Sequence, residues 1–243
     1  MGKTLTRNNP GRGITVKPIR AVQVILTLAL SLGVSGCVTS KVLHLPGELA
    51  RPGKGGTEQG TVGFPTVAVL DFNFAGDPPH EIGRDFNHAR AIVWKGDPGK
   101  AIPDLIAGVL NEKGLRAVRV PVGGPIPADA VARVWGSVDK FHVEARKTGS
   151  LGMKVKLAAS VSVTVFGSGG NVPPGWSSSV ASDYWAEDPF FVTPDGIRDA
   201  VNGAANAVAE ETVGKLVAAG VISLPPEPSS GPPEGQPPAG AGR

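Results

Sequence analysis

The sequence predicts an α+β domain: a mixed, largely antiparallel sheet with two helices packed on one of its faces, in the order β-α-β-β-β-β-α. Two observations carry this prediction. Residues 153–166 alternate apolar and mostly polar side chains, which is typical of a strand with one buried and one wetter face. Residues 102–113 and 194–219 instead repeat their apolar side chains at helical spacing.

The sequence of the first half of the domain predicts a strand, a helix and a second strand. Residues 65–72 (PTVAVLDF) are dense in branched apolar side chains and predict a buried strand. Residues 75–99 are loop-like, with a possible further strand at 89–94. The helix 102–113 has Pro103 in its first turn and Gly114 at its C′ position, and the strand 115–120 follows.

Three long strands and a helix complete the domain. The strands are predicted at 131–146, 153–166 and 176–186. The buried parity of the first one changes near Asp139, which predicts a β-bulge there. The last helix has Thr193 as its N-cap, Pro194 at N1, and an Ala-rich stripe that predicts close approach to the sheet.

The N-terminal segment is read as a targeting signal. Residues 1–20 contain five basic and no acidic side chains, and without those five the formal charge of +3 becomes −2. The basic balance therefore gives no support to nucleic-acid binding. The apolar run 21–33 is too short to span a bilayer and fits the h-region of a signal peptide.

A cysteine motif ends this signal. Val34, Ser35, Gly36 and Cys37 resemble the bacterial lipobox. The resemblance implies cleavage before Cys37, a diacylglycerol on its thiol and a fatty acyl chain, such as palmitate, on its new amino group. An ordinary signal peptide or an N-terminal anchor is the alternative. Val38 is not the aspartate that retains lipoproteins in the inner membrane, so the resemblance implies the outer membrane, facing the periplasm, with the inner membrane as the second choice.

Composition divides the remaining chain into three parts. Residues 37–64 follow as the lipidated cysteine and a flexible tether, because they are Gly-rich and lack hydrophobic periodicity. Residues 65–222 form the predicted domain. Residues 223–243 are rich in Pro and Gly and carry too little apolar surface to fold, so a disordered tail is expected.

The order of these elements resembles the YajG-like bacterial lipoproteins and, more distantly, the curli-pore (CsgG) and PelC type. The lipobox, the strand 67–72, the helix ending near Gly114 and the long alternating strands carry the resemblance. It implies an outer-membrane-anchored periplasmic protein without an assigned reaction.

Catalytic and metal motifs are absent from the sequence. No HExxH, CxxC, nucleophile elbow or P-loop spacing occurs. The densest polar cluster is read as a solvated loop in preference to a metal site. It comprises His80, Glu81, Asp85 and His88. Asp71 is read as a charge at a strand end in preference to a catalytic group.

One aromatic pair is the best candidate for partner binding. Adjacent strand residues point to opposite faces, so Tyr184 and Trp185 cannot both be buried if only one face of the sheet is covered. They form either a partner-binding edge, together with Phe190 and Phe191 beyond it, or a local cluster that packs the turn into the last helix.

These observations predict a membrane-anchored periplasmic lipoprotein that acts as a non-enzymatic envelope accessory, assembly or binding protein. We expect no cofactor beyond the covalent diacylglycerol and N-acyl lipid on Cys37. The expected partners are the membrane, the lipoprotein processing and sorting machinery, and an envelope protein or polymer. The alternative is an oligomeric subunit of an export or secretion apparatus, of the curli-pore or polysaccharide-export type.

Overall fold

The computed structural model forms eight strands and two helices within the residues that it describes. The described residues are 41–51, 64–75, 78–148, 154–170, 172–189 and 191–225. The strands are β1 (Val42–Leu45), β2 (Thr66–Leu70), β3 (His80–Asp85), β4 (Arg90–Trp94), β5 (Arg116–Val120), β6 (Ala130–Thr148), β7 (Lys154–Gly169) and β8 (Ser177–Pro189), and the helices are α2 (Pro98–Glu112) and α3 (Pro194–Ala218).

The long strand β6 organises a single mixed sheet. Along one side it pairs antiparallel with β7, and β7 pairs antiparallel with β8. Along its other side it pairs in parallel first with β2 and then, further along, with β3. β5 pairs with β2, while the β3–β4 hairpin carries β1 at its edge. The three longest strands are thus antiparallel and the short ones mostly parallel.

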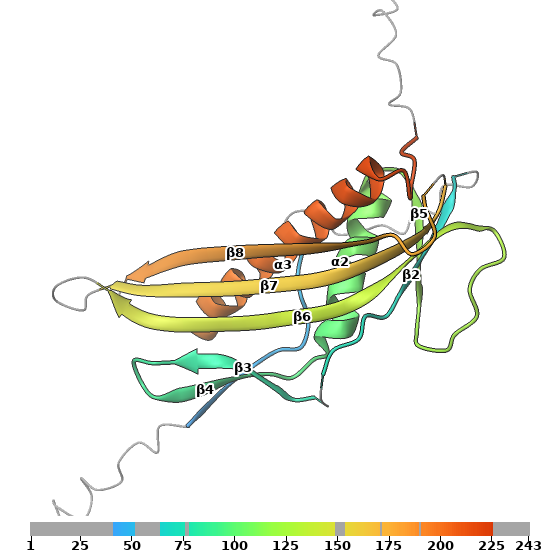
Figure 1. Cartoon of the computed structure of the whole chain (residues 1–243). Coiled ribbons are helices and arrows are strands. Elements are labelled where there is room, and N and C mark those ends of the chain that lie inside the picture. Colours follow the sequence, from blue (N-terminus) through green and yellow to red (C-terminus); the bar gives the residue numbers. More distant parts are fainter. Residues whose placement is uncertain are drawn as a thin grey trace, which may run out of the picture. The chain divides into compact units, whose positions relative to one another are not determined.

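Both helices cover one side of the three long strands (Figure 1). α3 packs on β7 and β8, α2 packs on β5, β6 and β2, and the two helices also contact each other. The buried members of β7 face them, and the buried stripe of α3 is rich in alanine. Small side chains allow the close approach that the sequence predicts. The α+β arrangement, with two helices on one sheet face, is confirmed.

Helix α2 begins earlier than predicted, at Pro98 instead of 102. Asp97 is its N-cap and accepts a hydrogen bond from the N–H of Gly99 at 2.8 Å. Pro103 therefore lies inside the helix, where it has no N–H for the carbonyl of Gly99. That carbonyl accepts the N–H of Phe72 at 2.8 Å, so a loop donor replaces the missing helical one.

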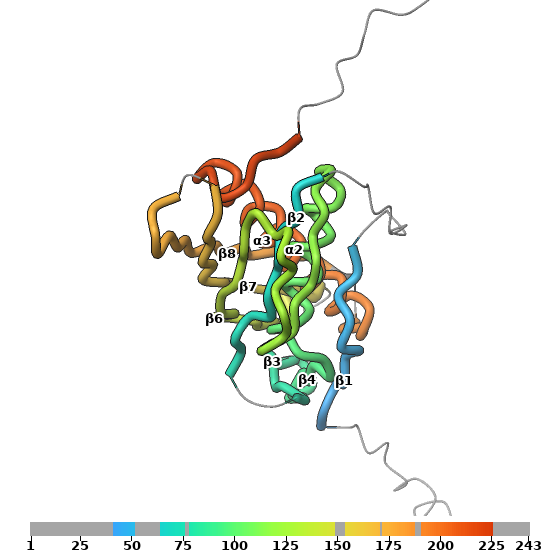
Figure 2. The backbone as a smooth tube through the Cα atoms, turned by 90° about the vertical axis from the view of Figure 1, so that its right-hand side faces the viewer, coloured from blue at the N-terminus to red at the C-terminus, as the bar shows by residue number. Residues whose placement is uncertain are grey.

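Two short strands differ from the sequence-based expectation, and a third was offered there only as a possibility. Residues 80–85, expected in a loop, form β3, and the possible strand at 89–94 is its hairpin partner β4. Residues 42–45, expected in the tether, form β1 in parallel with β4 (Figure 2). Leu45 is fully buried there. Four residues are too few to show a periodicity, and only pairing with β4 makes this segment a strand.

The chain after β1 continues onto the two helices. The N–H of Ala50 donates to the side chain of Asn202 at 3.2 Å, and Asn206 donates to the carbonyl of Ala50 at 3.1 Å. Arg51 then pairs with Glu112 of α2 at 2.6 Å and with Glu210 of α3 at 3.4 Å. Residues 42–51 therefore belong to the domain and shorten the expected tether.

Two local predictions are confirmed. The β6–β7 register shifts between Val138 and Lys140, where the bulge was expected. The N–H of Gly196 donates to Thr193, which caps α3 with Pro194 at its start.

Candidate functional site

The face of β6, β7 and β8 opposite the helices carries polar side chains and two tryptophans that reach solvent. The β7 positions between the buried ones are only half-buried and include Ser160, Ser162 and Thr164. Hydroxyls order this face across the strands. Ser137 and Thr164 both donate to Asp139 at 2.7 Å, and Asp139 stands at the β6 bulge. Ser160 donates to Asp183 of β8. The face is a flat polar platform.

Aromatic rings lie toward both ends of this platform. Trp135 stacks on Phe166 of the neighbouring strand, with ring centroids 6.0 Å apart. Trp185 lies further along β8, 62% exposed, with the Lys156 ammonium 5.5 Å from its ring centroid. The Trp135–Phe166 pair was not singled out from the sequence. The available signal was that both residues occupy polar-parity positions of their strands.

Tyr184 and Trp185 point to opposite faces, as strand alternation requires. Tyr184 packs on α3: a Cβ added to Gly203 would lie 2.7 Å from the tyrosine ring. It remains 43% exposed, while Trp185 belongs to the polar platform. Phe191 is exposed beyond the strand, and the side chain of Phe190 lies outside the described residues. Both tyrosine and tryptophan are accessible at the β8 edge.

The outer edge of β8 has no strand partner among the described residues. The Trp176 carbonyl points to β7, where it accepts the N–H of Gly167. By alternation, the backbone groups of Ser179, Ala181, Asp183 and later odd positions point outward. Lys215 of α3 donates to the outward carbonyl of Ser179 at 2.8 Å and covers the start of the edge. The stretch from Ala181 onward offers the free donors and acceptors of an edge strand.

The cluster of His80, Glu81, Asp85 and His88, which the sequence predicted as a solvated loop, is partly buried in the structure. Asp85 is fully buried and accepts hydrogen bonds from the Arg90 guanidinium at 2.8 and 3.1 Å and from the N–H of Asn87 at 3.0 Å. His88 lies 2.8 Å from the same carboxylate. These bonds hold the β3–β4 turn. The expectation of a solvated Asp85 was wrong, because the hairpin supplies partners that allow its burial.

The two remaining residues of that cluster lie apart from Asp85. His80, at the other end of β3, was also expected in solvent, but it is buried and packs edge-on against Phe74; Glu81 is exposed as expected. In the described part of the chain, no group of three or more His, Cys, Asp or Glu side chains is arranged to hold a metal ion.

Asp71 forms an ion pair with Arg119 that has a structural role. It accepts a hydrogen bond from Arg119 at 2.6 Å and another from the N–H of Val122 at 3.3 Å. Arg119 also donates to the Val69 carbonyl and to Asp104 of α2. Asp71 thus ties β2 to β5 and to the start of the following loop.

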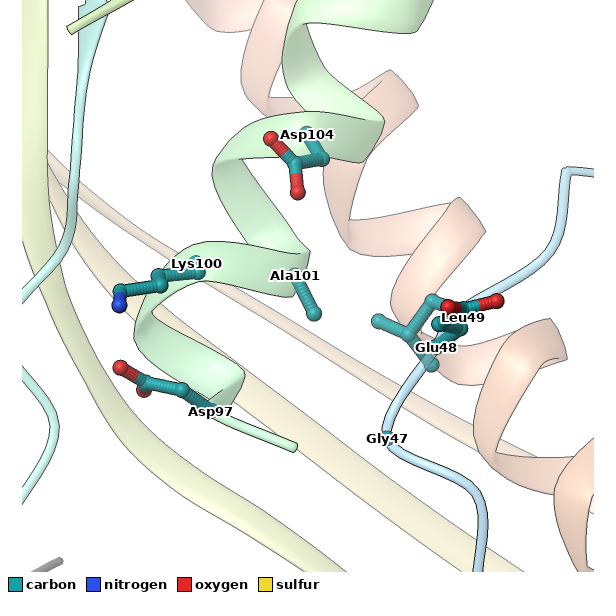
Figure 3. A pocket seen from close by; sticks show the side chains of 7 residues that line it. All are labelled: Gly47, Glu48, Leu49, Asp97, Lys100, Ala101 and Asp104. Atoms are coloured by element: carbon teal, nitrogen blue, oxygen red, sulfur yellow. The ribbon is translucent and has the colours of Figure 1, made fainter. Parts of the chain in front are cut away.

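A shallow pocket of about 380 Å³ lies beside the first turns of α2 (Figure 3). Glu48 and Leu49 line one side, and Asp97, Lys100 and Asp104 line the other. Asp97 already caps α2 and Asp104 pairs with Arg119, so two of its carboxylates have structural partners. The platform and the β8 edge remain the stronger candidate.

The lipidation motif lies outside the described residues. This applies to Val34, Ser35, Gly36 and Cys37, to residues 38–40 and 52–63 of the expected tether, and to residues 226–243 of the tail. Among the described helices, neither is long and apolar enough to cross a membrane.

Known family models and curated proteins give no match to this chain. Solved structures do. A Xanthomonas campestris protein of the DUF330 family is 11% identical with a TM-score of 0.45, over 74% of this chain and 97% of that one. A minor lipoprotein from Acinetobacter baumannii is 8% identical with a TM-score of 0.35, over 63% and 92%. The PelC dodecamer from Paraburkholderia phytofirmans is 17% identical with a TM-score of 0.30, over 60% and 85%. TM-scores of this size assign neither a family nor a function.

Proposed function

We propose that this protein is a lipid-anchored envelope lipoprotein that binds a partner protein at the β8 edge and catalyses no reaction. The anchor is Cys37, and Val38 after it favours the periplasmic side of the outer membrane. The order of elements that resembles the YajG-like lipoproteins agrees with this proposal.

The open β8 edge beside exposed Trp185 is the observation that carries the binding role. Outward backbone groups from Ala181 onward can pair with an extended segment of a partner. Trp185 lies on one side of that segment and Tyr184 on the other. Rigid aromatics beside an unpaired edge provide contact area at small entropic cost.

Photo-cross-linking in the native cell tests this role. A photoreactive amino acid replaces Ala181 on the β8 edge, and in the matched control it replaces Ala207, an exposed alanine of α3. We expect a discrete adduct from position 181 and none from 207. Trp185→Ala should weaken that adduct, since removing a central aromatic anchor costs about 2 kcal/mol or more, roughly thirtyfold in affinity.

Three results contradict the proposal. They are equal adducts at 181 and 207, an adduct that Trp185→Ala leaves unchanged, and an adduct that contains a carbohydrate polymer and no protein. The melting temperature of each variant is measured alongside, so that loss of the fold is not mistaken for loss of binding.

The second candidate function is an oligomeric subunit of an export apparatus. The same unpaired edge favours it, because a strand of another copy can occupy it. An adduct of twice the protein's mass, together with a ring-sized mass in detergent, distinguishes this function from binding of a different protein.

A further inference from the structure

The proposed anchor, Cys37, is close to the folded domain in the sequence. Residues 38–41 are all that separate Cys37 from β1. Lys41 already joins the sheet, because its carbonyl accepts the N–H of Ala91 at 3.0 Å. Five fully extended steps reach about 18 Å at most. An acylated Cys37 therefore holds the start of β1 within about 18 Å of the lipid surface.

The start of β1 defines one end of the sheet. Val42 pairs with Ala91 near the β3–β4 turn, and Asp85 before that turn pairs with Ala145 near the end of β6. The N–H of Lys147 donates to the Asn87 side chain at 2.7 Å, which joins the turn to β6. The β3–β4 turn, the end of β6 and the start of β7 are thus together at this end (Figure 1). We call it the entry end.

Basic and aromatic side chains gather at the entry end. Phe86 is 48% exposed in the turn, with the Arg146 guanidinium 4.3 Å from its ring centroid. The basic side chains are Lys41, Arg146, Lys147 and Lys154, whereas the Lys156 ammonium lies over the Trp185 ring further along the sheet. The acidic ones among the described side chains of these strand ends are Glu144, bound to Arg146, Glu187, bound to Lys154, and Asp85, buried on Arg90.

Acidic groups on the neighbouring helix do not cancel this charge. Asp195 and Asp199 stand in the first turns of α3, on the helix-bearing side of the sheet, and Asp195 pairs with Arg198 at 3.0 Å. Among the described side chains, the entry end keeps a basic excess around an exposed phenylalanine.

We propose that the entry end docks on the anionic phospholipid headgroups of the membrane that holds the anchor, so that the sheet stands end-on to the bilayer. This inference rests on the proposed acylation of Cys37. Lysine ammoniums bind lipid phosphates while their stems and the Phe86 ring contact the interface. Each basic residue near an anionic surface is worth about fivefold in the docked population. Trp185 lies four residues, or about 13 Å along the strand, from the end of β8, so the binding edge stays accessible.

Two single-cysteine variants of the full acylated protein test the orientation. Ala89→Cys places a thiol in the β3–β4 turn, and Ser177→Cys places one at the opposite end of β8, ten residues or about 33 Å from Glu187. Both residues are exposed, and acylated Cys37 leaves no other thiol. Each thiol carries a fluorophore, and the vesicles contain phosphatidylglycerol, phosphatidylethanolamine and a lipid with a nitroxide on its headgroup.

We expect strong quenching at position 89 and little at 177. Phe86→Ser combined with Lys147→Gln, or salt near 1 M, which shortens the screening length to about 3 Å, should reduce quenching at 89 severalfold while the protein stays on the vesicle. Vesicles of phosphatidylcholine with the same fraction of nitroxide lipid should give the same reduction. Equal quenching at both positions overturns the inference, and so does quenching at 89 that survives charge removal, salt and uncharged lipid.

The intact mass separates this inference from the proposed function. A mass without acyl chains overturns both. If the mass shows acyl chains but quenching follows either of the two overturning patterns, the anchor stands and only the proposed docking surface is refuted.

Discussion

Leu45→Ala tests whether β1 belongs to the folded domain. The sequence places residue 45 in a flexible tether, where the substitution would have no effect on stability. In the structure Leu45 pairs with Trp94 and is fully buried, whereas the adjacent His44 is exposed. The two neighbours therefore give opposite expectations on the same strand.

The burial of Leu45 sets the magnitude. Truncating a fully buried leucine to alanine costs about 2–5 kcal/mol, from the lost transfer free energy and the cavity left behind. For a domain of this size, that lowers the melting temperature by about 5–15 °C. His44→Ala should change stability by less than about 0.5 kcal/mol, as exposed substitutions usually do.

Urea unfolding of the mature-length chain, followed by far-UV circular dichroism, measures the free energy of unfolding of both variants and of the parent. Cys37→Ser in every sample removes the lipid and keeps the comparison in solution. Equal midpoints for Leu45→Ala, His44→Ala and the parent would refute the reasoning. That result would mean that the chain before residue 64 contributes nothing to the core.

The remaining predictions concern the sheet, the turn and the anchor. Val161→Asp places a charge on the helix-facing side of β7 and should cost more than about 3 kcal/mol, whereas Ser162→Asp on the platform should be tolerated; matching losses in thermal melts would invert the assigned faces. Burial raises the pKa of Asp85. Hydrogen bonds from Arg90, His88 and the Asn87 N–H lower the pKa by more than burial raises it, so it lies below its ordinary value. The stability from Asp85 should be present above about pH 4 and disappear as pH falls through the lowered pKa, and Asp85→Asn should flatten this loss in urea titrations at pH 7 and pH 3. Cys37→Ser should abolish labelling by a clickable fatty acid and leave an unprocessed precursor, and undiminished labelling would place the lipid elsewhere.

Where a signal depends on neighbours within the chain, the sequence alone was sufficient. The alternation along β7 and the cap and stripe of α3 are local patterns, and the parity change in β6 located its bulge. The separation of Tyr184 and Trp185 onto opposite faces follows from strand geometry alone. The lipobox motif is equally local, since four consecutive residues carry it, and lipidation of Cys37 stays a prediction.

Only the tertiary structure decided the elements that depend on distant partners. β1 is a strand because β4, nearly fifty residues later, pairs with it, and four residues have no periodicity of their own. Asp85 is buried because Arg90 and the hairpin turn satisfy its carboxylate, which a polar sequence does not reveal. The stacking of Trp135 on Phe166 and the basic entry end depend on strand register. The register of the strands is fixed when the chain buries one face of the sheet. This pairing brings together side chains that lie far apart in the sequence.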